Sequence, residues 1–159
     1  MAKPTASEFV AALRQVEEAG DVEPMVALHA ADARISNPTD QEPHVGPEGA
    51  RTFWTAYRKS FEHIHSRFHV VTESDTAAAL EWTSECRTAA GVETHYDGVS
   101  VFETKDGRIT RFVAYFDPAD LGTHAGAEGA GGANPRPDAY GTAPASVDSS
   151  EVAAGKTHP

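Results

Sequence analysis

The chain has 159 residues, of which 40% are hydrophobic and 23% charged, a composition typical of one globular domain. Its 24 acidic and 13 basic side chains give a formal charge of -11, which disfavours nucleic acid and anionic membrane surfaces as partners. No signal core follows Met1, no apolar run approaches membrane-spanning length, and the single cysteine, Cys86, cannot form an internal disulfide, so we expect a cytoplasmic protein.

The first helix is predicted to begin at a capping box. Thr5-Ala6-Ser7-Glu8 offers a hydroxyl and a carboxylate that can exchange hydrogen bonds with free backbone N–H groups. Phe9, Leu13 and Val16 follow at helical spacing, and Gly20 is suited to end the helix in a left-handed conformation.

Two shorter elements are predicted next. Asp21 can cap a second helix that runs to about Ala30. Ala33–Ser36 is a candidate strand, which is broken by Asn37-Pro38 and followed by a polar loop to Val45.

Gly46-Pro47-Glu48 opens the clearest helix of the sequence, because proline is tolerated in a first turn. One face of this helix carries a mostly aromatic stripe at positions i, i+3, i+4, i+7 and i+11. A stripe of this size must be covered by a large apolar surface. Its members are Ala50, Phe53, Trp54, Tyr57 and Phe61.

From about Ser66 the hydrophobic period changes to two, which is typical of strands. Short turns between the segments make successive strands antiparallel neighbours. Helices followed by such a meander predict an α+β domain with its helices on one face of the sheet. Cys86 lies in this region between charged neighbours, where we expect a buried structural thiol. The four predicted strands are Phe68–Glu73, Ala77–Arg87, Glu93–Thr104 and Arg108–Asp117.

The composition changes after Leu121. Residues 122–159 are rich in Gly, Ala, Pro, Ser and Thr and have almost no large apolar side chain. Such a segment cannot bury enough apolar surface to offset the entropy of ordering. We therefore predict one domain over residues 1–121 and a disordered tail over residues 122–159.

The order of these elements resembles the SnoaL-like branch of the nuclear-transport-factor-2-like superfamily. The resemblance implies a ketosteroid-isomerase-like cone, in which a curved, mainly antiparallel sheet and the helices enclose a central apolar pocket, often in a homodimer. It does not imply one function, because this fold carries many. The stretches that carry the resemblance are Gly20–Glu23 with Ala31–Ala33, His44–Ala50, and Gly98–Phe102 through Asp106–Ile109 to Tyr115–Pro118.

The catalytic sets of this superfamily are incomplete in this sequence. Isomerases need a carboxylate where this chain has Asn37, and two proton donors at positions that align near Leu13 and Gly98. Limonene-type epoxide hydrolases need an aspartate where Ala114 stands. Polyketide cyclases take a general acid from the last strand, which here offers only Arg111. The resemblance therefore predicts a pocket without a recognised catalytic set.

Strand alternation and the resemblance together place one set of side chains toward the pocket. Leu80, Trp82 and Ser84 are expected to face inward, because the charged residues of opposite parity in that strand would be costly inside. The alternative is that the aromatic side chains fill the core and leave no cavity. The residues that we expect to contact a ligand are Asn37, Phe53, Trp54, Tyr57, Trp82, Tyr96, Ser100, Phe112 and Phe116.

Two residues of the polar loop have alternative interpretations. Asn37 can hydrogen-bond to a ligand, or it can form an Asx turn before Pro38. Asp40 can act as a displaced base, although a solvated carboxylate is the favoured interpretation.

Several histidines lie in the predicted strands. His63, His65 and His69 share parity and could bind zinc, but Arg67 lies on the same face, so we expect a solvated strand edge and no metal site. His95 has the opposite parity to Tyr96 and is expected to face away from the pocket.

Two functional hypotheses follow. The favoured one is a domain that binds an apolar, cyclic or aromatic small molecule without a cofactor. The alternative is an isomerase, hydratase or cyclase that acts by proton transfer on a small cyclic substrate. Its candidate groups are Asp40, His44, Tyr57, Tyr96 and His95.

Overall fold

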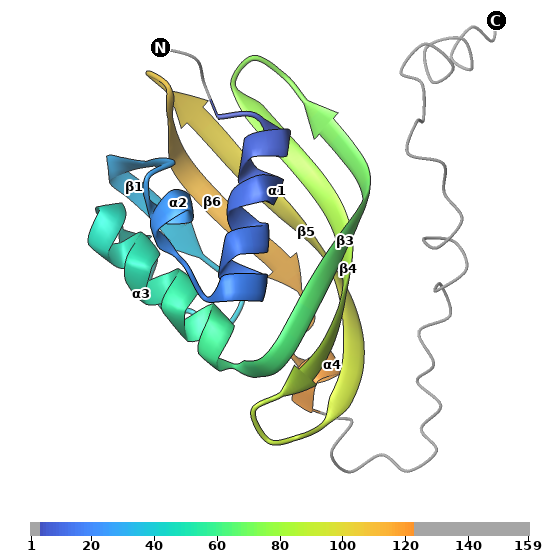
Figure 1. Ribbon diagram of the computed structural model, residues 1–159. Helices are drawn as coiled ribbons and strands as arrows, with labels where there is room; N and C mark the ends of the chain where they lie inside the picture. Colours follow the sequence, from blue (N-terminus) through green and yellow to red (C-terminus); the bar gives the residue numbers. More distant parts are fainter. Residues whose placement is uncertain (1–3, 123–159) are drawn as a thin grey trace, which may run out of the picture.

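The computed structural model describes residues 4–122. Figure 1 shows the helices of the N-terminal half lying across one face of a single sheet. The helical elements are α1 (Ala6–Arg14), the π-helical turn η1 (Gln15–Ala19), α2 (Glu23–Val26), α3 (Gly46–Lys59) and α4 (Ala119–Gly122). The strands are β1 (His29–Ser36), β2 (His44–Val45), β3 (Phe61–Glu73), β4 (Ala77–Thr88), β5 (Glu93–Lys105) and β6 (Arg108–Phe116).

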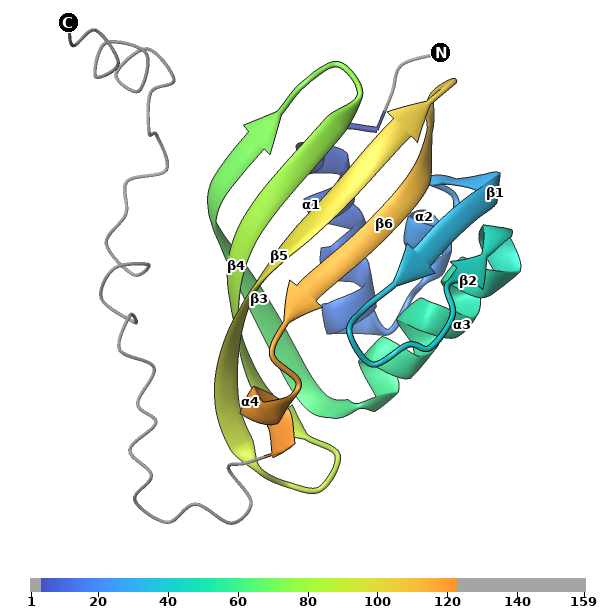
Figure 2. The same cartoon turned by 180° about the vertical axis from the view of Figure 1, so that it is seen from behind.

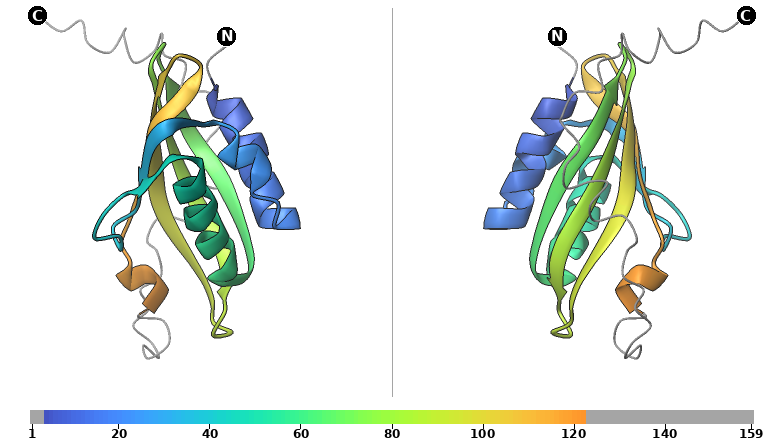
Figure 3. Two further views of the ribbon diagram at one scale, coloured as in Figure 1. Left: turned by 90° about the vertical axis from the view of Figure 1, so that its left-hand side faces the viewer. Right: turned by 90° about the vertical axis from the view of Figure 1, so that its right-hand side faces the viewer.

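The sheet has the strand order β2-β1-β6-β5-β4-β3. Strands β3 to β6 form the predicted antiparallel meander, and β1 joins it parallel to β6. The views in Figure 3 show the sheet curving, with α1 and α3 on the same side of it. Figure 2 shows the opposite face, which α1, α2 and α3 leave uncovered. The predicted α+β class with a curved, mainly antiparallel sheet is confirmed.

The N-terminal helix begins and ends as its sequence predicts. The Thr5 hydroxyl accepts a hydrogen bond from the Glu8 backbone N–H at 3.1 Å, and the Glu8 carboxylate accepts one from the Thr5 N–H at 2.7 Å. Gly20 ends the helical segment with a φ of 69°, where a side chain would be strained. The π-helical turn η1 was not predicted, because hydrophobic spacing does not distinguish it from α-helix.

The second helix and the first strand differ from their predicted bounds. Helix α2 ends at Val26 instead of near Ala30, and β1 begins at His29 instead of Ala33. Pairing with β6 explains the difference, since the Ile109 backbone N–H donates to the Leu28 carbonyl at 2.8 Å. The prediction was wrong here because a partner distant in sequence outweighs the local helical pattern.

Helix α3 begins at Gly46 as predicted, and its stripe residues Ala50, Phe53 and Trp54 are buried. Phe61 does not belong to this helix. It opens strand β3, which therefore begins seven residues before the predicted Phe68. The predicted i+11 position was wrong, although Phe61 is buried as expected.

The buried residues form two clusters. The larger one joins α1, α2, α3 and β1 to strands β4, β5 and β6. The smaller one contains Phe61, Ile64, Trp82, Cys86 and Tyr96. Burial raises the pKa of the Cys86 thiol to about 11, with Glu93 adding to the shift. The predicted buried structural thiol is confirmed.

None of the described helices is long and apolar enough to cross a membrane. The predicted tail lies, apart from Gly122, outside the described residues, so the predicted domain boundary at residue 121 stays a prediction.

Candidate functional site

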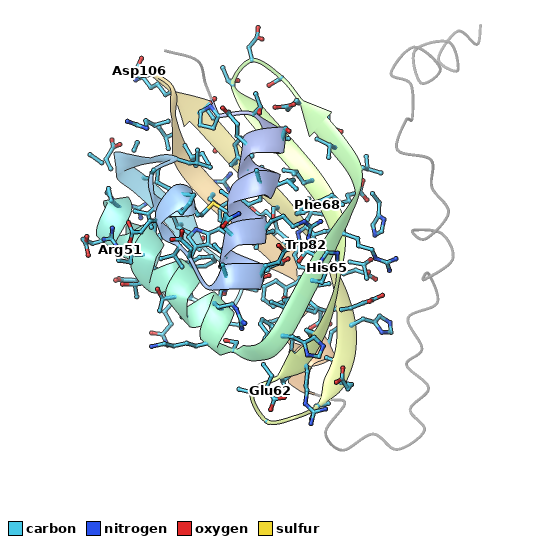
Figure 4. The ribbon with its side chains drawn as sticks, in the orientation of Figure 1. Arg51, Glu62, His65, Phe68, Trp82 and Asp106 are labelled. Carbon is cyan, nitrogen blue, oxygen red and sulfur yellow. The ribbon has the colours of Figure 1, made fainter. Side chains whose placement is uncertain are left out.

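The helices and the inner face of the sheet enclose a cavity of about 480 Å³. Its wall is mainly aromatic and carries a few polar side chains from α3, the sheet and the loop after β1. Figure 4 shows Trp82 in the interior, whereas Arg51 and Glu62 lie at the surface. All nine residues predicted to contact a ligand line this cavity: Asn37, Phe53, Trp54, Tyr57, Trp82, Tyr96, Ser100, Phe112 and Phe116.

Ring contacts hold the aromatic wall in place. Trp54 packs edge-on against Phe53 at 5.0 Å between ring centroids and contacts Phe112 at 5.2 Å. On the other side Tyr96 packs edge-on against Trp82 at 5.2 Å and Phe116 at 5.4 Å. Each such contact contributes about 0.5–1.5 kcal/mol beyond its buried area. The wall is therefore made of rings that pack against one another.

A glycine makes room for one of these rings. Gly98 pairs with Trp82 across β4 and β5, and a Cβ built on Gly98 would lie 2.5 Å from two atoms of the indole and 2.6 Å from the Tyr115 carbonyl oxygen. The indole N–H of Trp82 donates to the Ser100 hydroxyl at 3.0 Å. Gly98 and Ser100 together fix where the indole faces the cavity.

A buried carboxylate stands behind the polar part of the wall. The Glu17 side chain, on η1, has no exposed surface. Its Oε1 accepts hydrogen bonds from the Tyr57 hydroxyl at 2.8 Å and the Ser66 hydroxyl at 2.5 Å. Its Oε2 accepts from the Ser66 backbone N–H at 3.1 Å and from the Arg14 guanidinium at 3.3 Å. Four donors thus compensate the burial of this carboxylate.

The hydroxyls of Tyr57, Ser66, Ser84 and Tyr96 form one polar cluster in the cavity wall. The hydroxyls of Ser66 and Ser84 lie 2.6 Å apart, and Tyr96 is the cross-strand neighbour of Ser84 on β5. Burial raises the pKa of the Tyr57 hydroxyl well above its usual value, and the nearby Tyr96 and Glu17 raise it further. Burial likewise raises the pKa of Tyr96. Both phenols therefore keep their protons at neutral pH.

Glu17 was not among the predicted site residues, although the sequence carries a signal for it. Glu17 follows Leu13 by four residues and Phe9 by eight, so it lies on the same helical face as these buried side chains. A carboxylate on a buried face is costly unless it is paired, and such a position marks a candidate functional or structural polar site. Its partner Ser66 lies 49 residues away, a distance that helical spacing cannot bridge.

Asn37 lies in the cavity wall, and it also forms the Asx turn that was one of its two interpretations. Its side-chain oxygen accepts from the Thr39 backbone N–H at 2.8 Å and from the Thr39 hydroxyl at 2.6 Å. The side-chain oxygen is thereby engaged within the loop. Ligand contact by Asn37 remains a prediction.

The same turn pairs an aspartate with a histidine. Asp40 accepts from the Asn37 backbone N–H at 2.9 Å, and its other oxygen lies 3.3 Å from Nε2 of His44. Both side chains line the cavity and are less than one third exposed. We expected a solvated carboxylate at Asp40. That expectation was wrong, because the side chain is mostly buried and hydrogen-bonded. An aspartate that orients an imidazole at a cavity wall is an arrangement suited to proton transfer.

Gly49 allows α3 to approach this pair closely. A Cβ at Gly49 would lie 2.8 Å from the carbonyl carbon of His44. On the cavity side, the His44 ring packs edge-on against Phe53 at 5.8 Å. The helix therefore fixes the position of the imidazole.

The histidines of the outer surface have separate partners. His63 lies 3.7 Å from Glu93, and His65 lies 3.3 Å from Arg14. His69 sits at a β-bulge, where it bonds to the Thr83 hydroxyl at 3.0 Å. Within residues 4–122 no group of three or more His, Cys, Asp or Glu side chains is placed to hold a metal ion. His95 does not contribute to the cavity wall.

The positions that the resemblance implies for catalysis lie at or near the cavity wall. Leu13, Asn37 and Ala114 all line the cavity, and none of them carries an ionisable side chain. Gly98 lies beneath the Trp82 indole. The carboxylate and the imidazole of the cavity wall, Asp40 and His44, therefore occupy other positions than the catalytic groups that the resemblance implies.

Comparison with known proteins places the chain in one family. The family model described as "SnoaL-like domain" matches residues 7–112. No match was found among curated proteins. Among solved structures, the chain is similar to an NTF2-like protein from Anabaena variabilis, with 21% identity, a TM-score of 0.64, and coverage of 70% of this chain and 86% of that chain.

Two further solved structures illustrate the range of this fold. One is a protein with a ketosteroid isomerase-like fold from Catenulispora acidiphila in complex with trimethylamine, with 14% identity, a TM-score of 0.67, and coverage of 78% of this chain and 96% of that chain. The other is an LEH-like epoxide hydrolase from M. tuberculosis, with 20% identity, a TM-score of 0.57, and coverage of 76% and 91%. At these identities the likeness establishes the fold alone.

Proposed function

We infer that this chain, which belongs to the SnoaL-like domain family, binds a small molecule with an apolar ring system. The observation that carries the proposal is the aromatic-walled cavity of about 480 Å³ with a few convergent polar groups. Cavities of this size and lining are typical of small-molecule sites. A ligand that buries roughly 200 Å² of apolar surface would gain about 5 kcal/mol before the costs of association.

The wall supports a cyclic ligand over a flexible chain. The aromatic rings of the wall contact one another and therefore have little freedom to rearrange. They belong to Trp54, Trp82, Tyr96, Phe112 and Phe116. Flat ring systems pack against such surfaces in offset-stacked or edge-on geometry. The polar groups would then set the orientation of the ligand.

Native mass spectrometry of the purified chain tests the proposal directly, because a co-purifying molecule would show both occupancy and chemical class. Ala114→Phe fills part of the cavity and should abolish the bound mass. Ala79→Phe is the matched control, since Ala79 lies on β4 outside the cavity wall. Retention of the molecule by the Ala114→Phe protein would contradict binding in this cavity.

The two tryptophans of the chain supply a second readout. Trp54 and Trp82 are the whole tryptophan content, and both line the cavity. Ligand entry should therefore change the fluorescence of the native protein, while the Ala114→Phe protein should show no response to the same ligand.

A second candidate function is proton-transfer catalysis, favoured by the Asp40–His44 pair at the cavity wall. The imidazole would remove or deliver a proton, and Asp40 would hold its orientation and stabilise its charged form. The other cavity groups considered from the sequence, Tyr57 and Tyr96, keep their protons at neutral pH and would serve as hydrogen-bonding groups.

Isotope exchange separates the two candidate functions. The bound ligand is incubated with protein in deuterated water, and deuterium incorporation is followed by mass spectrometry. Catalysis predicts exchange that His44→Gln abolishes while binding persists, and that the control His95→Gln preserves. Binding without any exchange or conversion in the unaltered protein would leave the ligand-binding function alone.

Homodimer formation through the outer face of the sheet is part of the proposal. Tyr115 is 49% exposed there, beside Val99, Val101 and Val113 on the neighbouring positions of β5 and β6. Light scattering of the full chain and of Tyr115→Glu tests this, and a monomer at all concentrations would refute it. Cytoplasmic location stays a proposal that the single buried thiol Cys86 supports.

A further inference from the structure

We propose that the cavity selects ligands that donate a hydrogen bond to Tyr57, because the Tyr57 hydroxyl donates its own hydrogen bond to Glu17 and its oxygen is left as an acceptor. The ligand class is an apolar ring compound with a hydroxyl or amine N–H group. This inference rests on the proposed ligand-binding function of the cavity and specifies its chemistry.

The direction of the protons follows from the partners of Glu17. The Ser66 backbone N–H and the Arg14 guanidinium can only donate, and both point to Oε2. The hydroxyls of Tyr57 and Ser66 converge on Oε1. A carboxylate can only accept hydrogen bonds, so each of these hydroxyls must use its single proton to donate to Oε1 of Glu17.

The same direction extends along the wall. Because the Ser66 proton is committed to Glu17, the 2.6 Å contact between Ser66 and Ser84 requires Ser84 to donate. Ser84 then has only acceptor capacity left for a further partner. Hydrogen bonds that point one way along a chain polarise one another, which strengthens each acceptor. Tyr57, Ser66 and Ser84 therefore can accept hydrogen bonds from a ligand but have no proton to donate to it.

Charge adds a second selection. Glu17 behind the wall and Asp40 at the wall are both carboxylates, and they are opposed within hydrogen-bonding or ion-pair distance by Arg14 and His44. Placing an anion in this apolar space beside two carboxylates would be costly. The selected ligands are therefore neutral or cationic, and a carboxylate on the ring is disfavoured.

The Ser100 hydroxyl, in contrast, can donate a hydrogen bond to a ligand. The Ser100 oxygen accepts from the Trp82 indole, and no other residue within residues 4–122 takes the Ser100 proton, so this hydroxyl can donate to a ligand acceptor. A hydrogen bond to Ser100 cannot substitute for one to Tyr57, because Tyr57 lies on α3 and Ser100 lies on β5. Preference for a donor therefore depends on Tyr57 and Glu17, and changes at these residues test it.

Three probes of one ring system separate the contributions: β-naphthol, its methyl ether and β-naphthoate, each titrated into the full chain by calorimetry. A net hydrogen bond of about 1–1.5 kcal/mol predicts that β-naphthol binds roughly fivefold to tenfold tighter than the ether. The extra methyl group of the ether acts against this difference, so the criterion is conservative. β-Naphthoate should bind more weakly than either.

Two variants assign the preference to its residues. Tyr57→Phe should bring the affinity for β-naphthol down to that for the ether, and unchanged ether binding shows that the cavity is intact. Tyr115→Phe is the matched control, because Tyr115 lies outside the cavity wall, and it should keep the full preference.

Glu17→Gln makes the sharpest test, because its orientation is fixed by the two obligate donors. The amide oxygen must accept from the Ser66 N–H and Arg14, which places the NH₂ group against the hydroxyls of Tyr57 and Ser66. Tyr57 then accepts, its proton is released toward the cavity, and the preference should shift toward the ether.

The outcomes are distinguishable. Equal affinities for β-naphthol and the ether in the unaltered chain, or a preference that Glu17→Gln leaves unchanged, overturn the donor selection while the ligand-binding function stands. Failure of all three probes to bind overturns both. Loss of the preference in Tyr57→Phe together with its shift in Glu17→Gln supports the assignment.

Discussion

Replacing Gly98 by alanine should damage the cavity wall, because the added methyl group would collide with the Trp82 indole. The new Cβ would lie 2.5 Å from two indole atoms of Trp82 and 2.6 Å from the Tyr115 carbonyl oxygen. Overpacking of this kind costs about 1–3 kcal/mol. Displacement of the indole also breaks its hydrogen bond to Ser100, which adds about 1 kcal/mol.

Urea unfolding followed by tryptophan fluorescence measures the sum. A loss of about 2–4 kcal/mol corresponds to a midpoint lowered by roughly 1–2 M when the slope is about 2 kcal/mol/M. The native emission should change as well, because Trp82 is one of only two tryptophans. Ligand affinity should fall with it, since the indole forms part of the cavity wall.

A double-mutant cycle controls for effects unrelated to the indole. In a Trp82→Leu background the contact with the ring disappears while the contact with the Tyr115 carbonyl remains, so the cost of Gly98→Ala should fall but not vanish. A Gly98→Ala protein within about 0.5 kcal/mol of the parent, with unchanged emission, would refute the reasoning.

Three further predictions concern stability and reactivity. Burial lowers the pKa of His29 below its usual 6.5, although a bond to the Met25 carbonyl opposes the shift, so the unfolded chain binds the proton more readily. Its contribution is therefore fully present above pH 6.5 and lost as the pH falls from there toward the lowered pKa, and urea midpoints measured across this window should decrease less in His29→Gln. Thr5→Ala should cost about 1 kcal/mol in thermal or urea unfolding, because it removes the cap of α1, and an unchanged midpoint would contradict that role. Cys86, buried and with a pKa raised to about 11, should react with a disulfide reagent only in denaturant, and fast labelling of the native protein would contradict its burial.

The fold could be predicted where local chemistry decides the structure. The capping box at Thr5, the left-handed Gly20 and the start of α3 at Gly46 each depend on a few neighbouring residues. The antiparallel meander followed from period-two spacing and short turns. The start of β1 and the true place of Phe61 escaped prediction, because partners on β6 and β4 determine them.

The candidate site divides in the same way. The aromatic wall was predictable, since strand parity and helical spacing indicate which rings face inward, and all nine predicted residues line the cavity. The polar groups were harder to predict. Glu17 reaches Ser66 across 49 residues, and Asp40 meets His44 only because a turn at Asn37 folds the loop back. Hydrogen-bond partners of this kind are set by tertiary structure.

The parallel pairing of β1 with β6 also bears on how the chain folds during synthesis. β1 is made early, yet its parallel partner β6 is the last of the described strands to leave the ribosome, and closing such a long-range pair is entropically slow. Strand β6 completes the wall of the cavity with Phe112, Ala114 and Phe116. A nascent chain that ends before β6 therefore lacks part of the cavity wall, and its inner aromatic side chains stay accessible to chaperones until β6 has emerged.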